Sequence, residues 1–220
     1  MEDKIEAKAS MEAEASKEAK ASMEAKASKE VICRIAGLLF QKGLVSGKDG
    51  NISIKTANDE MLITPSGVCK GFLTPDMIIR QRFDGTVTEG SLKSTREAAM
   101  HSRLYELRPD IGAIVHTHPA AATAFAVCGR GFPQNWLLEV PALIGKIGIA
   151  GFAPAGSAKL VEEVEKVADS DVIFLCNHGV ITYGPDIYEA FSRMDAVENT
   201  AKTILFAGML GDAKEFDETM

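Results

Sequence analysis

Several features that define other classes of protein are scarce in this sequence. Its 220 residues include four cysteines and one tryptophan, and aromatic residues make up only 6%. Cys33, Cys69, Cys128 and Cys176 are widely spaced and form no CxxC pair. Since no apolar leader stretch precedes them, we expect free thiols in a reducing cytoplasm and not a disulfide framework.

Long apolar runs and excess positive charge are also missing. No run of about 18 uncharged apolar residues occurs, so we do not expect a membrane-spanning helix. Lysine and arginine number 24 against 31 aspartates and glutamates, which gives a net charge of −7. Nucleic-acid binding needs a basic face, so we expect no nucleic-acid partner. A small anionic substrate stays compatible with this charge, because local charge governs such a site.

The first thirty residues differ in kind from the rest. From Glu6 they repeat a six-residue unit rich in alanine, glutamate and lysine, which all favour helix. At 3.6 residues per turn a six-residue period places like positions on three faces, so no apolar stripe forms. We therefore expect residues 1–30 to be a solvated tail, helical or disordered, and residues 31–220 to form one domain.

From Val31 onward the hydrophobic periodicity alternates between helix and strand. Helices are predicted over 31–43, 95–107, 120–127, 157–168 and 186–210, and a helix start at Thr74-Pro75. Strands are predicted over 52–55, 61–64, 111–116 and 172–176, the last of them continuing through 180–183. The segment 137–149 mixes both signals. This alternation is typical of a layered α/β domain.

Three of the four histidines occupy places suited to a metal ion. His116 and His118 follow an apolar strand, and side chains at i and i+2 of a strand project to the same side. His178 also ends an apolar run and precedes Gly179, which permits a tight turn. Three neutral imidazoles with an open coordination position are typical of catalytic zinc. The spacing indicates a divalent-metal site, against the alternative that such histidines are structural.

Glu97 is the candidate acid–base residue, from its place in the first turn of the helix predicted over 95–107. A carboxylate there also has a purely structural explanation, because it favours the positive end of the helix dipole. Only a location beside the metal would favour catalysis. His101 lies on the same helix face, four residues later. We expect it to be structural, or to contact the residues that hold the metal without binding the metal itself.

Two glycine-containing turns are candidates for binding an anion. Their sequences are Gly50-Asn51-Ile52-Ser53 and Thr64-Pro65-Ser66-Gly67. Free N–H groups and hydroxyls in such turns can bind phosphate. Most turns of this composition only reverse the chain, so each motif alone is a weak signal.

The order of these segments resembles the class II aldolase and adducin-head superfamily, and within it the fuculose-phosphate-aldolase-like enzymes. The resemblance covers about residues 31–210 and rests on GNIS, TPSG, STRE with Glu97, RPDIGAIVHTH and LCNHGVITYG. It implies a three-layer α/β/α sandwich around a mainly antiparallel sheet. It also implies a homotetramer with its sites at subunit interfaces.

The resemblance further implies roles for individual residues. Zinc, or another divalent ion such as Mn²⁺ or Co²⁺, would be held by His116, His118 and His178, with Glu97 as general acid/base. The implied reaction is reversible cleavage of a small phosphorylated ketose to a dihydroxyacetone-phosphate-like product and an aldehyde. The substrate would be held by six residues of the turns and the STRE segment: Gly50, Asn51, Ser66, Gly67, Thr95 and Arg96.

Two departures from the aldolase pattern leave other functions open. Arg96 stands where the aldolases often have a second phosphate-binding serine, and it suits phosphate, carboxylate or solvent. The aldolases also have tyrosines near position 137 and in the C-terminal tail, where this chain has Trp136-Leu137 and no tyrosine after Leu210. The alternatives are a sugar-acid-phosphate decarboxylase, a pentulose-phosphate 4-epimerase and a non-catalytic adducin-like interaction module. The epimerases usually carry aspartate at the position of Glu97, so the glutamate speaks against an epimerase. An interaction module has no need of a metal site, so the three histidines speak against that alternative.

Overall fold

Strands and helices alternate along residues 2–216, the part of the chain that the computed structural model describes. The strands are β1 (Asn51–Lys55), β2 (Glu60–Ile63), β3 (Ile79–Arg82), β4 (Val87–Glu89), β5 (Ala113–Thr117), β6 (Ile147–Ala150), β7 (Val172–Leu175) and β8 (Gly179–Gly184). The helices are α1 (Glu2–Gln41), α2 (Ala98–Leu107), α3 (Ala120–Val127), α4 (Ala158–Glu165) and α5 (Ile187–Leu210). Short 3-10 turns cover Lys70–Phe72 and Pro75–Met77.

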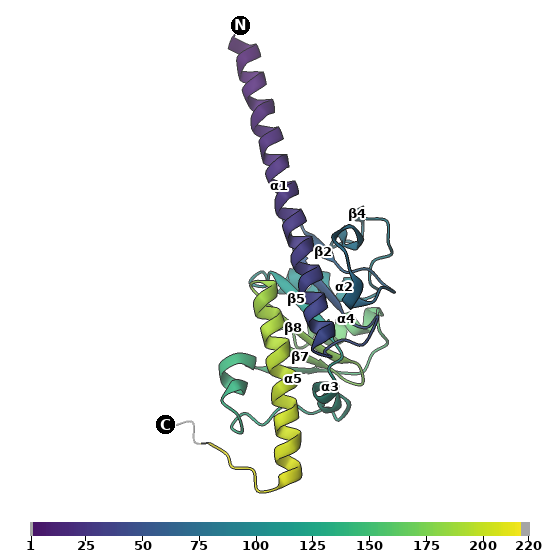
Figure 1. Cartoon of the computed structure of the whole chain (residues 1–220), viewed down its shortest axis with the longest axis vertical. Coiled ribbons are helices and arrows are strands. Elements are labelled where there is room, and N and C mark those ends of the chain that lie inside the picture. Colours follow the sequence, from purple (N-terminus) through teal and green to yellow (C-terminus); the bar gives the residue numbers. More distant parts are fainter. Residues whose placement is uncertain (1, 217–220) are drawn as a thin grey trace.

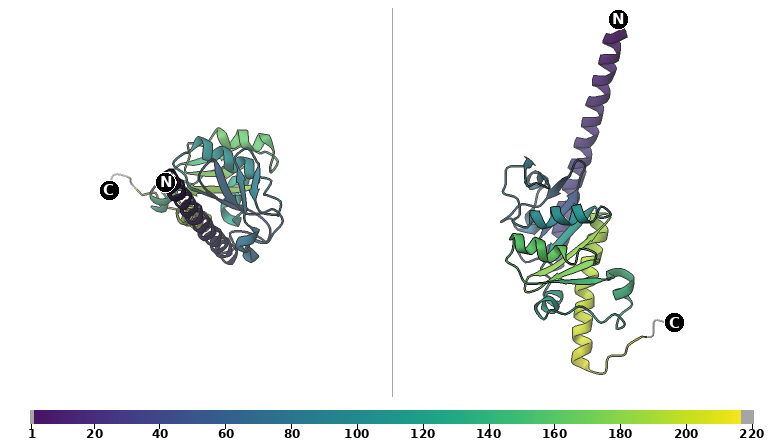
Figure 2. Two further views of the ribbon diagram at one scale, coloured as in Figure 1. Left: turned by 90° about the horizontal axis from the view of Figure 1, so that it is seen from above. Right: turned by 180° about the vertical axis from the view of Figure 1, so that it is seen from behind.

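These strands form one sheet in the order β4-β3-β2-β1-β5-β8-β7-β6. Neighbouring strands are antiparallel except for β6 and β7, which pair in parallel. Helices α1, α3 and α5 cover one face, and α2 and α4 cover the other (Figures 1 and 2). The predicted three-layer sandwich around a mainly antiparallel sheet is therefore confirmed.

The central strands bury side chains on both faces, which explains their apolar runs. In β5, Ala113 and Val115 join the core under α1, α3 and α5, whereas Ile114 joins the core under α2 and α4. Strand β7 alternates in the same way. A two-residue period combined with full burial thus fixes which helices each side chain meets.

Helix α4 starts at its predicted cap, because the Ser157 hydroxyl accepts the Leu160 N–H. Helix α5 starts in the same way, with Asp186 accepting two backbone N–H groups. Among the described residues, no helix combines the length and the apolar character needed to cross a bilayer.

Three local predictions are wrong. The segment 180–183 does not continue the strand over 172–176, because Asn177 adopts a left-handed conformation (φ 58°) and the chain reverses into the β7–β8 hairpin. The helix expected after Thr74 is only a single 3-10 turn. Glu97 lies just before α2, which begins at Ala98, and is not in its first turn.

Helix α1 is longer than predicted. It begins at Glu2, runs through residue 30 without a break, and extends beyond the layers at its N-terminal end (Figure 1). The strong helix propensity of alanine, glutamate and lysine explains the continuity. The division into a tail and a domain at residue 30 stays a prediction, and it falls inside one helix.

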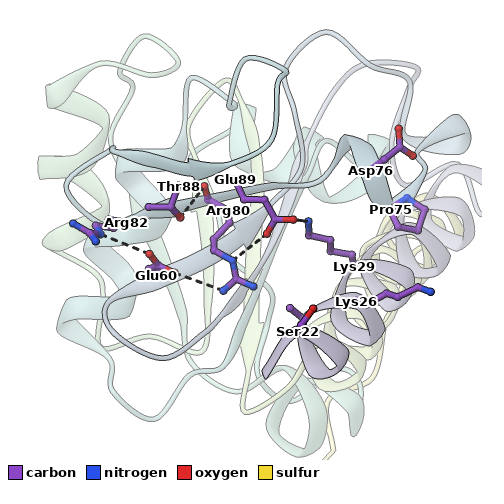
Figure 3. Close-up of a pocket in the computed structure, with 11 residues that line it drawn as sticks. Ser22, Lys26, Lys29, Glu60, Pro75, Asp76, Arg80, Arg82, Thr88 and Glu89 are labelled. Carbon is purple, nitrogen blue, oxygen red and sulfur yellow. Dashed lines mark hydrogen bonds and ion pairs between the residues drawn. The ribbon is translucent and has the colours of Figure 1, made fainter. Parts of the chain in front are cut away.

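The end of the repeat contacts the sheet edge. The Lys29 ammonium is buried and pairs with Glu89 of β4 at 2.5 Å. Glu89 also pairs with Arg80 of β3, and Arg80 with Glu60 of β2 (Figure 3). These residues line a surface hollow of about 800 Å³. These ion pairs attach α1 to the sheet. Because Glu60 and Glu89 neutralise Arg80 and Lys29, the hollow has little net charge with which to bind a ligand.

We predict that the two ends of α1 differ in their effect on stability. Deleting residues 2–21 should leave the thermal midpoint nearly unchanged, because their repeat has no apolar stripe to bury. Ile35→Ala should lower the free energy of unfolding by about 2–5 kcal/mol, because Ile35 is 1% exposed in the core. Thermal and denaturant unfolding of both variants test this. A loss of similar size on deleting 2–21 would contradict it.

Candidate metal centre and substrate pocket

Strand pairing brings the three histidines together. Strand β5 pairs with β8 so that His116 lies opposite Ile181 and Thr117 opposite Val180. His118 follows β5 directly, and His178 lies in the turn that precedes β8. The histidines therefore meet at one end of this strand pair, although they are far apart in sequence.

Two backbone features of the β7–β8 turn allow this meeting. Asn177 takes the left-handed conformation, which asparagine tolerates better than most residues. Gly179 leaves room for the His118 ring, because a Cβ there would lie 2.5 Å from the His118 Cδ2. Any larger residue at position 179 would push that ring away.

The histidine nitrogens form a compact donor set. One ligand atom from each of His116, His118 and His178 lies within 4.8 Å of the others. The Nε2 atoms of His116 and His118 are 3.2 Å apart. The Nδ1–H of His116 donates to the Val180 carbonyl at 2.9 Å, which fixes the ring and leaves Nε2 free to ligate. This arrangement fits a divalent ion such as zinc.

Burial favours the neutral imidazoles that a metal needs. Burial first, and the neighbouring His116 and His178 second, lower the pKa of His118 to about 3. Burial also lowers the pKa of His178, with His116 acting in the same direction. Because only neutral imidazole ligates, these two rings need lose no proton near neutral pH.

Glu97 lies against two of the histidines. One carboxylate oxygen is 3.3 Å from His116 Nε2 and the other is 3.2 Å from His178 Nε2. Burial alone would raise the pKa of Glu97, but the two histidines and the Asn51 amide hold it well below its ordinary value. Glu97 therefore lies beside the histidine cluster, the location that favours an acid–base role over a purely structural one.

Asn51 and Thr95 complete the surroundings of this carboxylate. The Asn51 Nδ2 donates to Glu97 at 2.7 Å and contacts the Thr95 hydroxyl at 3.2 Å. Asn51 begins β1 and lies opposite His116 of β5, so the sheet register places it beside the histidines. Gly50 must be glycine, because a Cβ there would lie 2.6 Å from the His116 carbonyl oxygen.

A pocket of about 150 Å³ opens beside Glu97. All the predicted site residues line it except His116, which is fully buried behind it. Those lining residues are Gly50, Asn51, Ser66, Gly67, Thr95, Arg96, Glu97, His118 and His178. The structure thus gathers the two turns, the STRE segment and the histidines at one place. Their individual roles stay predictions.

The spacing arguments missed two lysines in this pocket. Lys48 and Lys70 both line it, and Lys70 is 1% exposed. The Lys70 ammonium donates to the carbonyls of Lys48 and Val68, so it ties the two glycine turns together. Burial lowers its pKa, although Cys69 and Asp49 nearby act against this. The sequence offers one signal for Lys70, which is a lysine within the largely apolar segment VCKGFL that follows TPSG.

The segment where the resemblance to the aldolases leads us to expect a tyrosine lies in another hollow. Trp136 and Leu137 line a groove with Ile204 and Ala207 of α5. Neither residue is among those that line the pocket beside Glu97 in this chain. That pocket is lined by no tyrosine among the described residues.

Comparison with known proteins agrees with this geometry. The model of the class II aldolase and adducin N-terminal domain family matches residues 30–205. The chain belongs to this family. Class II aldolases depend on a divalent metal, and the histidine cluster described above is present in this chain.

Individual relatives carry two different activities. L-fuculose phosphate aldolase of Methanocaldococcus jannaschii is 37% identical over 79% of this chain and 92% of its own length. The 3-oxo-tetronate 4-phosphate decarboxylase of Escherichia coli is 31% identical over 81% of this chain and 86% of its own. The crystal structure of YgbL from Escherichia coli, put forward as an aldolase, epimerase or decarboxylase, superposes with a TM-score of 0.81. It is 27% identical and covers 89% of this chain and 96% of its own.

We predict that zinc binding requires the histidine cluster and stabilises the fold. Elemental analysis should find one zinc per wild-type chain and none in His118→Ala. Zinc at about 100 times its dissociation constant should add about 2.7 kcal/mol to the free energy of unfolding of the wild type. The matched control is His101→Gln, which changes the histidine outside the cluster and should keep its zinc. Equal zinc content in wild type and His118→Ala would contradict the site.

Proposed function

We propose that this protein is a metal-dependent class II aldolase that reversibly cleaves a phosphorylated ketose to a dihydroxyacetone-phosphate-like product and an aldehyde. The observation that carries the proposal is the Glu97 carboxylate, held between His116 and His178 beside a pocket lined with cationic and hydroxyl groups. The 37% identity to an L-fuculose phosphate aldolase supports the same reaction class.

The pocket chemistry supports a phosphorylated substrate. Gly50 and Gly67 both have positive φ, and such turns present backbone N–H groups toward an anion. The Ser66 and Thr95 side chains add hydroxyl donors. Lys48 and Arg96 are exposed at the same pocket and supply positive charge for a phosphate group. We assign phosphate binding to the part of the pocket that these residues line.

The reaction then divides between the histidines and Glu97. A divalent ion held by His116, His118 and His178 would supply Lewis-acid stabilisation of the negative charge that develops when the carbon–carbon bond breaks. In the condensation direction the ionised Glu97 would take the proton from the carbon next to the carbonyl, and in the cleavage direction it would return to that carbon a proton taken up from water. Asn51, through its bond to one Glu97 oxygen, would keep that carboxylate at the reacting carbon.

A second candidate is a sugar-acid-phosphate decarboxylase. Aldol cleavage also needs a group that takes the proton from the substrate hydroxyl, and no tyrosine is present among the described residues that line this pocket. Loss of carbon dioxide from a carboxylate has no such proton to remove. Arg96 lines the pocket where it can pair with a carboxylate, and one relative is a 3-oxo-tetronate 4-phosphate decarboxylase.

We also propose that the chain assembles as a homotetramer. Large apolar side chains are exposed at the C-terminal end of α5, namely Phe206, Met209 and Leu210, and in the segment 138–143 that packs along α5, namely Leu138 and Leu143. Such a group of exposed apolar side chains is what a subunit interface covers. Light scattering of the purified chain tests this assembly.

We predict that Glu97→Gln keeps zinc and loses turnover. Glutamine preserves the shape of the side chain but cannot carry the proton, so kcat should fall about 100-fold or more. Initial rates and elemental analysis on the same preparation check both parts. Glu106→Gln is the control, because Glu106 is exposed on α2, the helix that Glu97 precedes, and pairs with Arg103. A Glu97→Gln variant with wild-type kcat would remove Glu97 from the chemistry.

A substrate screen distinguishes the two candidate reactions. Phosphorylated ketoses, including fuculose 1-phosphate, and 3-oxo-tetronate 4-phosphate should be assayed for release of aldehyde and of carbon dioxide. An aldolase releases aldehyde from the ketose, and a decarboxylase releases carbon dioxide from the acid.

The Arg96→Ser variant adds a second distinction. If the protein is an aldolase, the variant should raise KM for the ketose less than about 10-fold, whereas a decarboxylase should lose far more affinity for its acid substrate. Zinc-loaded protein with neither activity would favour another reaction on this scaffold, and protein that folds without binding metal would favour an interaction module.

A further inference from the structure

His101 is the one histidine outside the metal cluster, and it is fully buried in α2. Its Nε2 lies 2.5 Å from the Asn51 Oδ1, and its Nδ1 lies 2.7 Å from the Ser53 hydroxyl. Burial lowers its pKa to about 3, and His116 acts in the same direction. The ring is therefore neutral, with one nitrogen that donates a hydrogen bond and one that accepts.

The partners decide which nitrogen carries the proton. A carboxylate accepts only, so the Asn51 amide must turn its NH₂ toward Glu97 and its oxygen toward His101. The His101 Nε2 must then donate, and its Nδ1 must accept from the Ser53 hydroxyl. The Ser53 oxygen is left to accept from the Tyr105 hydroxyl at 2.7 Å. The direction of each hydrogen bond in this network is therefore fixed.

Residue spacing on β1 and α2 brings the members of this hydrogen-bond network together. Asn51 and Ser53 are alternate residues of β1, so they project to the same face of the sheet. His101 and Tyr105 are four residues apart on α2, so they lie on one helix face. The two pairs meet between β1 and α2 in the buried core. Tyr105 is further held by a stacked contact with Phe83.

We propose that His101, Ser53 and Tyr105 are positioning residues that lock the Asn51 amide with its NH₂ toward Glu97. Without His101 the amide can rotate by half a turn and point its oxygen at the carboxylate, which loses the hydrogen bond and adds repulsion. Glu97 is then free to move away from His116 and His178. The kinetic consequence rests on the proposed function, whereas the hydrogen-bond direction does not.

One spectroscopic experiment tests the hydrogen-bond direction without any substrate. Nitrogen-15 NMR of the full zinc-loaded chain, labelled at histidine, should show His101 with its proton on Nε2 between about pH 6 and 8. The assignment follows from the signal that disappears in His101→Gln. A proton on Nδ1 in the wild type would overturn the proposal, whatever the enzyme turns over.

Kinetics of four variants test the positioning role. His101→Leu should lower kcat about 10- to 100-fold, the effect expected of one hydrogen bond to a charged group, and should keep its zinc. His101→Gln should recover most of this loss, because its amide can again donate to Asn51. Ser53→Ala should lower kcat, whereas Ser102→Ala should not. Ser102 is the matched control, since it is buried on α2 and its hydroxyl has no hydrogen-bond partner among the described residues.

The outcomes separate this inference from the proposed function. Equal loss in His101→Gln and His101→Leu, or equal rates in Ser53→Ala and Ser102→Ala, would overturn the positioning role. The Ser53→Ala comparison stands even if leucine at position 101 prevents folding. A wild type that turns over none of the compounds would count against the proposed reaction alone, and the NMR result would still decide the hydrogen-bond direction.

Discussion

The antiparallel pairing of β5 with β8 is the constraint on which the site depends. With Thr117 opposite Val180, the end of β5 and the turn before β8 must lie side by side, and that turn carries His178. Gly179 leaves space for the His118 ring beside this pairing, because a Cβ there would lie 2.5 Å from the His118 Cδ2. The two helical layers cover this strand pair on both faces, so the strands that carry or adjoin the three histidines are anchored in the core.

Charge in this site is separated over a short distance. Glu97 is buried, and an unpaired buried carboxylate is costly, so the histidines and the Asn51 amide that surround it are needed to keep it ionised. Three cationic side chains, Lys48, Lys70 and Arg96, line the same pocket. Under the proposed function, these cationic groups would bind the anionic group of a substrate, and Glu97 would carry out the proton transfer.

Much of this arrangement could be predicted from the sequence, and the failures have physical causes. Periodicity placed α3 correctly, and the strand-end settings of His116 and His178 were sufficient to suggest a shared site. The reversal at Asn177 was missed because apolar residues on both sides resemble one long strand. The contact between Asn51 and His101 was missed because it joins a strand to a helix, and residue spacing within either element carries no information about such a pair.

The central claim is that three imidazoles of one chain hold a divalent ion, and X-ray absorption at the zinc edge tests it most directly. The full-length protein, loaded with one equivalent of zinc, should show three imidazole nitrogens at about 2.0–2.1 Å together with one or two oxygen ligands. His178→Ala should lower the imidazole count. A sulfur ligand at about 2.3 Å, or a shell of oxygens without imidazole, would contradict the account.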